Sequence, residues 1–562
     1  MSRSRSRTGL SRSTASRLKR LAGGASRLSL TALIWLLPPP VLPTPSRTGT
    51  EGPPRPYGAS PRVGPQAPPT PAKLARAQDR ELLDGPFPSS GLVRGVSDGT
   101  VLLNPNVSVR TRGLALIRAA GASVVRIPVD WRDLVSPDPP PGFDPSDPSS
   151  PAYDFSALDA SVQSAVAAGL RPLLVVSHAP AFAEAPGRWP YAYPGSWAPN
   201  PTALQQFAQA LATRYDGHYS PPEAPRRALA RVSLFQAWNE PNLARYLEPQ
   251  WVVANGQWTP FSPNLYREML NGFYAGVTAA QPEATVVSAG VAPNGDPAGE
   301  GRMAPITFLQ TMLCIDARAR RVYEGCPQPP HFDVLAFHPL SVGDPDAPAA
   351  LATDVAISDA AKIGDLLTRA RRLATALPAG EKPMWVTELN WESAPQASHG
   401  VPPALQAQWV SRALHRLWIA GVTQVDWQFL VDPYPALHAA TPTGGLIEYQ
   451  RPAGLYSVGP DGSLEQARPK RFLTGFTVPF DPLRVSRRMI RVWALLMRPR
   501  QPLLLQRVAG PGRAWRTIAH LHAGRDGVLN LLIALRGAAR LRLRSGTLVS
   551  AVGSVPAGRS RL

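Results

Sequence analysis

Eight short runs of apolar and β-branched residues recur along the chain, and they constrain its fold more than any other feature. From the second run onward they begin 40 to 60 residues apart, and helical patterns fill the gaps between them. Strands that alternate with helices, with no hairpin turns between, predict a parallel sheet. The runs are Leu92–Ser97, Val124–Asp130, Pro172–His178, Val232–Glu240, Ala284–Val291, Phe332–His338, Pro383–Asn390 and Thr423–Leu430.

Eight such strand–helix units favour an α/β fold, a (β/α)8 TIM barrel with long loops. The rival is a doubly wound open sheet, but no G-x-G-x-x-G sequence follows the first run. Two helix starts have local signals. Asn200-Pro201 predicts an N-cap followed by proline at the first helical position, and Ser156 to Asp159 has the pattern of a capping box.

The composition changes after about residue 480, where alternating runs are separated by glycine-containing turns. This pattern predicts a small C-terminal antiparallel β-sandwich. We therefore expect the barrel to span residues 86–478 and the sandwich residues 485–558. The alternating runs are Leu503–Arg507, Ile518–His522, Val528–Leu535 and Ala539–Arg544.

The N-terminus has the pattern of an export signal over residues 1–37, with many arginines followed by the apolar stretch Leu28–Leu37. That stretch is too short to cross a bilayer. The usual small-residue cleavage site is missing, so an uncleaved signal anchor and a cytoplasmic basic tail stay open as alternatives. Residues 38–85 are expected to form a proline-rich linker. We expect a secreted or cell-surface protein with no integral membrane domain beyond a signal anchor.

The net charge of +20 is concentrated at the two ends of the chain. Residues 1–50 hold nine basic and no acidic residues, and residues 481–562 hold sixteen arginines against Asp481 and Asp526. The remaining 430 residues are nearly neutral. A nucleic-acid-binding domain would carry its positive charge on the main body, so no nucleic-acid partner is expected. The arginine-rich C-terminal domain is instead suited to contact an acidic cell-surface polymer.

The two cysteines, Cys314 and Cys326, are twelve residues apart. A disulfide closing a loop of this size would stabilise an exported protein by about 3 kcal/mol. In a cytoplasmic protein the same residues would be two buried thiols.

In a parallel barrel, functional groups lie where the strands end. The chain has two carboxylates there, Glu240 after the fourth run and Glu388 in the seventh, which suits glycoside hydrolysis by an acid and a nucleophile or base. A single glutamate at such a position is more often a surface or salt-bridging residue. The combination with other polar residues at strand ends favours a site. These further candidates are Arg126, His178, Asn239, His338 and Trp427.

Two segments resemble the acid/base and nucleophile segments of glycoside hydrolase clan A. They are F-Q-A-W-N-E-P-N at 235–242 and M-W-V-T-E-L-N at 384–390. The clan includes the cellulase-like family five and the xylosidase-like family thirty-nine, and the similarity covers roughly residues 88–475. The resemblance implies a retaining glycosidase that cleaves O-glycosidic bonds of a β-linked glycan or glycoside. It also implies a carbohydrate substrate and chemistry with no metal and no cofactor.

By the same resemblance, Glu240 is the general acid/base and Glu388 the nucleophile. Asn239 would bind the 2-hydroxyl of the sugar, and Arg126 would hold Glu388 ionised. The remaining roles implied are positioning of the carboxylates and sugar by His178 and His338, and a stacking floor formed by Trp427. The ordinary alternatives are packing roles for the histidines and a core position for Trp427.

One position departs from the clan pattern, because Leu340 stands where many members carry a tyrosine that hydrogen-bonds the nucleophile. This departure keeps a second hypothesis open, a non-catalytic glycan-binding or cell-surface protein on a degenerate glycosidase barrel. Aromatic residues such as Trp189 and Trp391 occupy the predicted loops above the site. They are candidates for sugar subsites, and the alternative is that they pack the loops together. No metal-binding motif occurs.

Overall fold

The computed structural model describes residues 91–316, 328–341, 343–395, 400–433, 451–459, 462–508 and 513–557, with Pro88, Val322, Cys326 and Ala397. The predicted export signal (1–37) and linker (38–85) lie outside the described residues. Within the described part, no helix combines the length and the apolar character needed to span a membrane.

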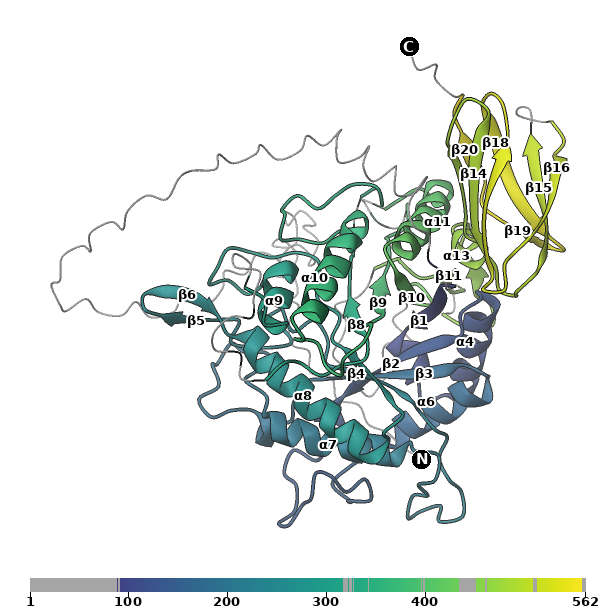
Figure 1. The fold of residues 1–562 in the computed structure, drawn as a ribbon. Coiled ribbons are helices and arrows are strands. Elements are labelled where there is room, and N and C mark those ends of the chain that lie inside the picture. Colours follow the sequence, from purple (N-terminus) through teal and green to yellow (C-terminus); the bar gives the residue numbers. More distant parts are fainter. Residues whose placement is uncertain are drawn as a thin grey trace, which may run out of the picture. The chain divides into compact units, whose positions relative to one another are not determined.

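Eight parallel strands form one sheet in the order β7-β4-β3-β2-β1-β10-β9-β8 (Figure 1). Parallel bridges from Val287 to Val334 and from Val291 to Phe337 join its two ends, so the sheet closes into a barrel. The predicted (β/α)8 fold is therefore confirmed, and the open sheet is excluded. The strands are β1 Val93–Ser97, β2 Val124–Asp130, β3 Arg171–Ser177, β4 Leu234–Ala237, β7 Thr285–Ser288, β8 Leu335–Phe337, β9 Met384–Leu389 and β10 Val422–Gln428.

Helices follow the strands and cover the outside of the barrel (Figure 1). Asn200 caps α7 as predicted, since its side chain accepts from the backbone N–H groups of Thr202 and Ala203. The capping box predicted at Ser156 is wrong: Ser156 is already inside α6, and the preceding Phe155 makes no side-chain cap. The helices are α3 Gly99–Leu102, α4 Val107–Ala119, α5 Trp131–Leu134, α6 Ser156–Ala167, α7 Pro201–Arg214, α8 Ser262–Ala280, α9 Pro305–Met312, α10 Ala360–Arg372, α11 Pro403–Ile419 and α13 Leu473–Thr477.

A β-hairpin interrupts the connection after β4, contrary to the expectation of no hairpins between the barrel strands. Its strands are β5 (Trp251–Ala254) and β6 (Gln257–Pro260). Asn255 and Gly256 form the turn, and both have positive φ angles, 52° and 72°. Asn-Gly is the favoured pair for such a turn because both residues tolerate the left-handed conformation. The signal was therefore present in the sequence.

The interior of the barrel changes from apolar to polar along the strands. An apolar cluster fills one layer, and its members include Val124 in β2, Leu234 in β4 and Trp385 in β9. Side chains two residues apart on a strand face the same way. The next layer towards the C-terminal ends is therefore formed by polar residues, namely Arg126, Gln236 and Thr387.

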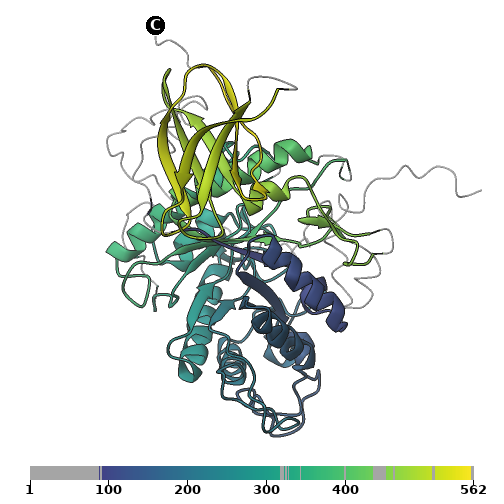
Figure 2. The ribbon, with the colours of Figure 1, turned by 90° about the vertical axis from the view of Figure 1, so that its right-hand side faces the viewer.

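The C-terminal region forms two antiparallel sheets that enclose a common apolar core, seen from a second side in Figure 2. All four predicted runs are strands, but the region begins earlier than residue 485, with β13. The first sheet contains β13 Phe480–Arg484, β14 Met489–Leu495 and β17 Val528–Ala534. The second contains β15 Pro502–Val508, β16 Arg516–His522, β18 Ala539–Ser545, β19 Leu548–Val549 and β20 Gly553–Val555.

A buried histidine joins barrel helix α11 to these sheets. The Nδ1 atom of His415 lies 2.7 Å from Oδ2 of Asp481 in β13. The imidazole ring stacks on Trp493 of β14, with 4.6 Å between ring centroids. Elsewhere, Cys314 and Cys326 form a disulfide, which is the first of the two alternatives that the sequence left open for these residues.

Candidate active site

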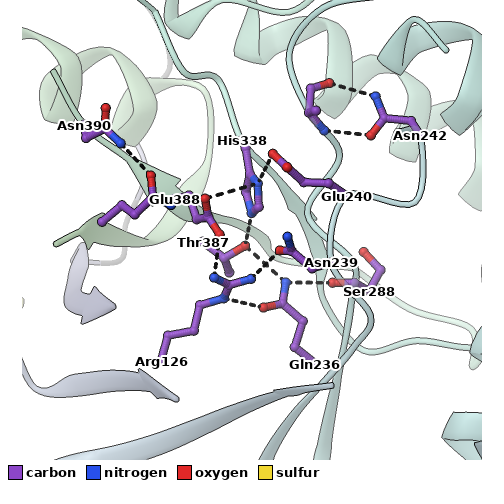
Figure 3. Close-up of polar contacts among 12 residues, drawn as sticks. Arg126, Gln236, Asn239, Glu240, Asn242, Ser288, His338, Thr387, Glu388 and Asn390 are labelled. Carbon is purple, nitrogen blue, oxygen red and sulfur yellow. Dashed lines mark hydrogen bonds and ion pairs between the residues drawn. The ribbon is translucent and has the colours of Figure 1, made fainter. Parts of the chain in front are cut away.

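The polar layer inside the barrel is organised by Arg126, a buried residue of β2. Each nitrogen of its guanidinium donates a hydrogen bond, with Nε 2.8 Å from Oε1 of Gln236, Nη1 2.7 Å from Oε1 of Glu388 and Nη2 2.7 Å from Oδ1 of Asn239 (Figure 3). Arg126 therefore connects the ends of β4 and β9 across the barrel.

Glu240 reaches the mouth of the barrel because the backbone bends sharply after β4. Trp238 and Glu240 both have positive φ angles, 78° and 36°. This conformation is uncommon for residues with a side chain, and strain of this kind costs about 1–3 kcal/mol per residue and clusters at functional sites. The Glu240 N–H donates to the carbonyl of Gly290, which holds the bend in place.

Glu388 is aimed at the same place by an irregularity in β9. The pairing of β9 with β10 shifts register here: Val386 pairs with Val425 and Leu389 with Trp427, so β9 contains one extra residue. A bulge of this kind re-aims a side chain. About a tenth of the side-chain surface of Glu240 and of Glu388 is exposed, so neither carboxylate is sealed in the interior.

His338, which directly follows β8, connects the two carboxylates. Its Nδ1 lies 3.0 Å from Oε1 of Glu240 and 3.9 Å from Oε2 of Glu388. Its ring is fully buried against Gly290, where an added Cβ would be only 2.1 Å from Nε2. Glycine at position 290 therefore makes room for the histidine. The structure brings together five of the residues that the sequence analysis selected: Arg126, Asn239, Glu240, His338 and Glu388.

Two residues that the sequence analysis missed complete this network. The amide nitrogen of Gln236 donates to Oγ1 of Thr387 and to the carbonyl of Ser288, each over 3.1 Å. Oγ1 of Thr387 lies 2.9 Å from Nε2 of His338. Both side chains are fully buried. A polar residue within an otherwise apolar strand, such as Gln236 between Phe235 and Ala237, was the signal available in the sequence.

A third buried carboxyl group lies near the site, on β10. Burial raises the pKa of Asp426 to about 7, and the negative charge of Glu388 adds to this shift, while a hydrogen bond from Gln424 and the charge of Arg126 oppose it. An added Cβ at Gly95 on β1 would be only 2.0 Å from Asp426 Oδ1, so glycine there leaves space for this carboxyl. Asp426 is therefore a group near the site that titrates close to neutral pH.

His178 lies at the end of β3, as predicted. Its hydrogen bonds among the described residues are to Asp130 and Ser177, and none is to Glu240 or Glu388. Its Nδ1 is 3.0 Å from Oδ2 of Asp130 and 3.3 Å from the hydroxyl of Ser177. Its ring stacks on Tyr246, with 5.4 Å between centroids.

Two of the three tryptophans predicted to contact sugar are buried. Trp427 has no exposed surface, donates to the carbonyl of Ala453 and packs against Phe472. Trp391 is 2% exposed and donates to the carbonyl of Gly343. In this structure neither offers a ring face to a ligand, so the packing alternative describes both. Trp189 is half-buried and packs against Trp197, with 4.7 Å between centroids.

Glu240, His338 and Glu388 are the one group of potential metal ligands among the described residues, with one ligand atom of each within 4.8 Å of the others. The hydrogen bonds that Glu240 and Glu388 make to His338 and Arg126 do not suit a metal site. Arg126 already neutralises Glu388, and its positive charge would repel a cation at the same place.

Comparisons with known proteins were made by sequence and by structure. No family model matches the chain, and no curated protein matches it. Similar solved structures include a family 39 glycoside hydrolase from Bacteroides cellulosilyticus WH2, with 16% identity, a TM-score of 0.45 and coverage of 80% of this chain and 81% of that chain. A glucosidase from Croceicoccus marinus has 14% identity, a TM-score of 0.43 and coverage of 80% and 95%. A GH39 β-xylosidase from Caulobacter crescentus has 14% identity, a TM-score of 0.41 and coverage of 80% and 97%.

These scores are too low to bear on substrate or mechanism. In the closed barrel, Glu240 follows the fourth strand and Glu388 lies in the seventh, at the positions where the sequence resemblance placed the two carboxylates.

Proposed function

We propose that this chain is a retaining glycosidase that hydrolyses O-glycosidic bonds in a β-linked glycan or glycoside. The observation that carries the proposal is the pairing of Glu240 and Glu388, which present carboxylate oxygens within 4.8 Å of each other. Retaining enzymes place their carboxyl groups about 5–5.5 Å apart, and inverting enzymes about 6.5–9.5 Å apart to admit a water molecule. A closest approach of at most 4.8 Å between oxygens of the two carboxylates suits the shorter, retaining spacing.

In the proposed reaction the two carboxylates have different roles because their partners differ. Glu388 accepts a charge-assisted hydrogen bond from the guanidinium of Arg126, which holds its carboxylate in place as the nucleophile. It attacks the anomeric carbon while Glu240 transfers a proton to the leaving oxygen. Glu240 then accepts a proton from water as that water attacks the glycosyl–enzyme bond and releases Glu388. The amide of Asn239, held by Arg126, is placed to bind the sugar.

The proposal is tested with a panel of aryl β-glycosides while proton NMR follows the anomeric configuration of the first product. A β-configured first product supports the proposal, and an α-configured one contradicts it. Glu388→Gln should abolish turnover and leave glycan binding intact, because the amide keeps the shape of the side chain but cannot act as the nucleophile.

A second candidate function, glycan binding without efficient chemistry, is favoured by Leu340. The usual tyrosine donor to the nucleophile is missing there, although Arg126 supplies one donor to Glu388. If the wild-type protein binds a glycan and turns over no member of a broad panel, this second function holds.

We further propose that the protein is exported or held at the cell surface. The disulfide between Cys314 and Cys326 supports an oxidising compartment. Fractionation of cells that produce the full chain tests this location. Recovery of the protein in the cytoplasm with free thiols would contradict it.

A further inference from the structure

We propose that Gln236 and Thr387 are positioning residues that fix the tautomer of His338. Through His338 they determine which oxygen of Glu240 carries the acid proton. The catalytic consequence rests on the proposed function, whereas the tautomer itself does not.

The direction of the hydrogen bonds is set by Arg126, because a guanidinium can only donate. Its Nε donates to Gln236, so the amide oxygen of Gln236 faces the arginine and its NH2 group faces away. That NH2 group has two hydrogens. One is donated to the carbonyl of Ser288, which can only accept, and the other to Oγ1 of Thr387 (Figure 3).

Donor and acceptor roles can be assigned in the same way to the hydrogen bond between Thr387 and His338. Because Oγ1 accepts from Gln236, the single hydroxyl hydrogen of Thr387 is free to be donated, and Nε2 of His338 lies 2.9 Å away. Nε2 is then the unprotonated nitrogen, and a neutral imidazole carries its hydrogen on Nδ1. A hydrogen on Nε2, in the neutral Nε2–H tautomer or in the doubly protonated ring, would leave the hydroxyl hydrogen of Thr387 with no acceptor among the described residues. Donor counting therefore selects the neutral Nδ1–H tautomer.

This tautomer determines where the acid proton is placed. Nδ1–H donates to Oε1 of Glu240 over 3.0 Å, so Oε1 acts as an acceptor. In the acid form of Glu240 the proton must then be on Oε2. In the proposed reaction that proton passes to the leaving oxygen, and Oε2 later takes a proton from the attacking water. The chain of hydrogen bonds thus keeps one oxygen of Glu240 in the catalytic role throughout the cycle.

The tautomer is tested by nitrogen-15 NMR on protein labelled at its nine histidines. The His338 signals are assigned by their loss in His338→Gln. The expected result is a protonated Nδ1 and an unprotonated Nε2 in the wild type and in Thr387→Ser. In Thr387→Val, which keeps the shape of threonine but lacks the hydroxyl, this single pattern should be lost. A wild-type imidazolium or Nε2–H form would overturn the proposal, as would an unchanged spectrum in Thr387→Val.

The effect on Glu240 is tested with two leaving groups. The phenol of a phenyl glycoside leaves only when the acid protonates it, whereas the 2,4-dinitrophenolate of a dinitrophenyl glycoside is a good enough leaving group to depart without that proton. Thr387→Val should lower kcat/KM, which reports formation of the glycosyl–enzyme intermediate, about tenfold for the phenyl substrate. It should hardly change kcat/KM for the dinitrophenyl substrate, and Thr387→Ser should behave like the wild type on both. Equal losses on both substrates would mean that Thr387 has a structural role only. If the wild type turns over neither substrate, the proposed function fails while the NMR experiment still decides the tautomer.

An independent observation concerns the outer face of the C-terminal strand β18. Arg540, Arg542 and Arg544 alternate along it with the buried residues Leu541 and Leu543. Residues two apart on a strand are separated by about 7 Å and face the same way. The strand therefore carries three arginine side chains in a row on one face.

This row has no acidic counterpart. Among the described residues, none of the three arginines forms an ion pair. Of the two acidic residues after position 480, Asp481 is buried against His415, and Asp526 lies in the turn between β16 and β17. The guanidinium of Arg542 instead lies over the half-buried ring of Trp515, 4.2 Å from its centroid.

We propose that this face binds a linear acidic polysaccharide. Arginine pairs with carboxylates through two parallel hydrogen bonds, so three arginines along one face of a strand suit a linear chain that carries repeated carboxylates. The partner expected from the charge of this domain is thereby assigned to one sheet face.

Polygalacturonate serves as the probe, with neutral dextran and duplex DNA as comparisons. Replacing all three arginines of the row by glutamine should weaken polygalacturonate binding at least tenfold. The matched control replaces Arg487, Arg488 and Arg536, which are exposed elsewhere on the same domain, and should change binding less than threefold. Equal losses in the two triple variants would overturn the proposal, as would DNA binding as tight as that of polygalacturonate.

Discussion

Two buried histidine–carboxylate pairs in this protein have the same local geometry and different surroundings. His338 lies 3.0 Å from Glu240 at the mouth of the barrel, and His415 lies 2.7 Å from Asp481 where the barrel meets the C-terminal sheets. Both imidazole rings are fully buried, and both use Nδ1 for the carboxylate.

The remaining ring nitrogen distinguishes the pairs. Nε2 of His338 is bonded to Thr387, whereas Nε2 of His415 has no hydrogen-bond partner among the described residues. The His338 pair also has a second carboxylate, Glu388, within 3.9 Å, and the His415 ring is instead stacked on Trp493. A histidine–carboxylate pair therefore indicates chemistry only when a further reactive group and an opening accompany it.

The largest expected effects are on activity for the His338–Glu240 pair and on stability for the His415–Asp481 pair. Glu240→Gln should lower kcat/KM on phenyl glycosides roughly 10²–10⁴-fold, the usual contribution of a general acid, with little change in stability. Asp481→Ala should lower the free energy of unfolding by about 1–3 kcal/mol, because it leaves the buried Nδ1 of His415 without its hydrogen-bond partner, with kcat unchanged per folded molecule. Steady-state kinetics and urea unfolding of both variants test this contrast. A loss of stability in Glu240→Gln together with a loss of activity in Asp481→Ala would contradict the assignment of chemistry to the first pair and of stability to the second.

Gly290→Ala should displace His338 without touching the other pair. The added Cβ would lie 2.1 Å from Nε2, so the ring must move. A misplacement of about 1 Å near a reacting group costs roughly hundredfold in rate, which kcat on phenyl glycosides would report. Gly364→Ala in α10 is the control, since its nearest contact would be an ordinary 3.6 Å to Met384. Full activity of Gly290→Ala would show that the position of His338 is not critical.

The His415 pair should make stability depend on pH. Burial lowers the pKa of His415, against the opposing hydrogen bond with Asp481. Burial alone would raise the pKa of Asp481, but Arg412 and His415 together hold it below its usual value. Both groups therefore bind protons more readily in the unfolded chain. The stabilisation linked to His415 is present above pH ~6.5 and declines as the pH falls below it, and that linked to Asp481 is lost below pH ~3.9.

Urea unfolding between pH 7 and pH 4 measures this dependence. The double variant His415→Phe/Asp481→Asn should show a shallower decline than the wild type over that range. An equally steep decline would place the acid sensitivity elsewhere in the chain.

The smallest effect is expected from Leu340→Tyr, which restores the aromatic donor typical of the clan. Because Arg126 already donates to Glu388 over 2.7 Å, kcat should change less than about threefold, a gain worth no more than one weak hydrogen bond. A tenfold or larger increase would show that Arg126 does not compensate and would favour the degenerate-barrel alternative.

Much of the barrel could be predicted because its signals are local. Each of the eight predicted runs coincides with a barrel strand to within a few residues, and the strand-end rule selected Glu240 and Glu388 before any comparison. The burial of Trp427 and Trp391 could not be predicted in the same way. Sequence spacing says that an aromatic residue is near a strand end, but not whether its ring faces a ligand or the packed core.

The sequence by itself determined the element types and the positions of the two carboxylates, because strand and helix periodicities and strand-end residues are properties of short segments. Only the tertiary structure decided that Gln236 and Thr387 join Arg126 to His338, or that His415 meets Asp481. These partners are 49 to 151 residues apart along the chain. Hydrogen bonds over such separations depend on how the barrel closes and on which way each strand residue faces, and no local pattern contains that information.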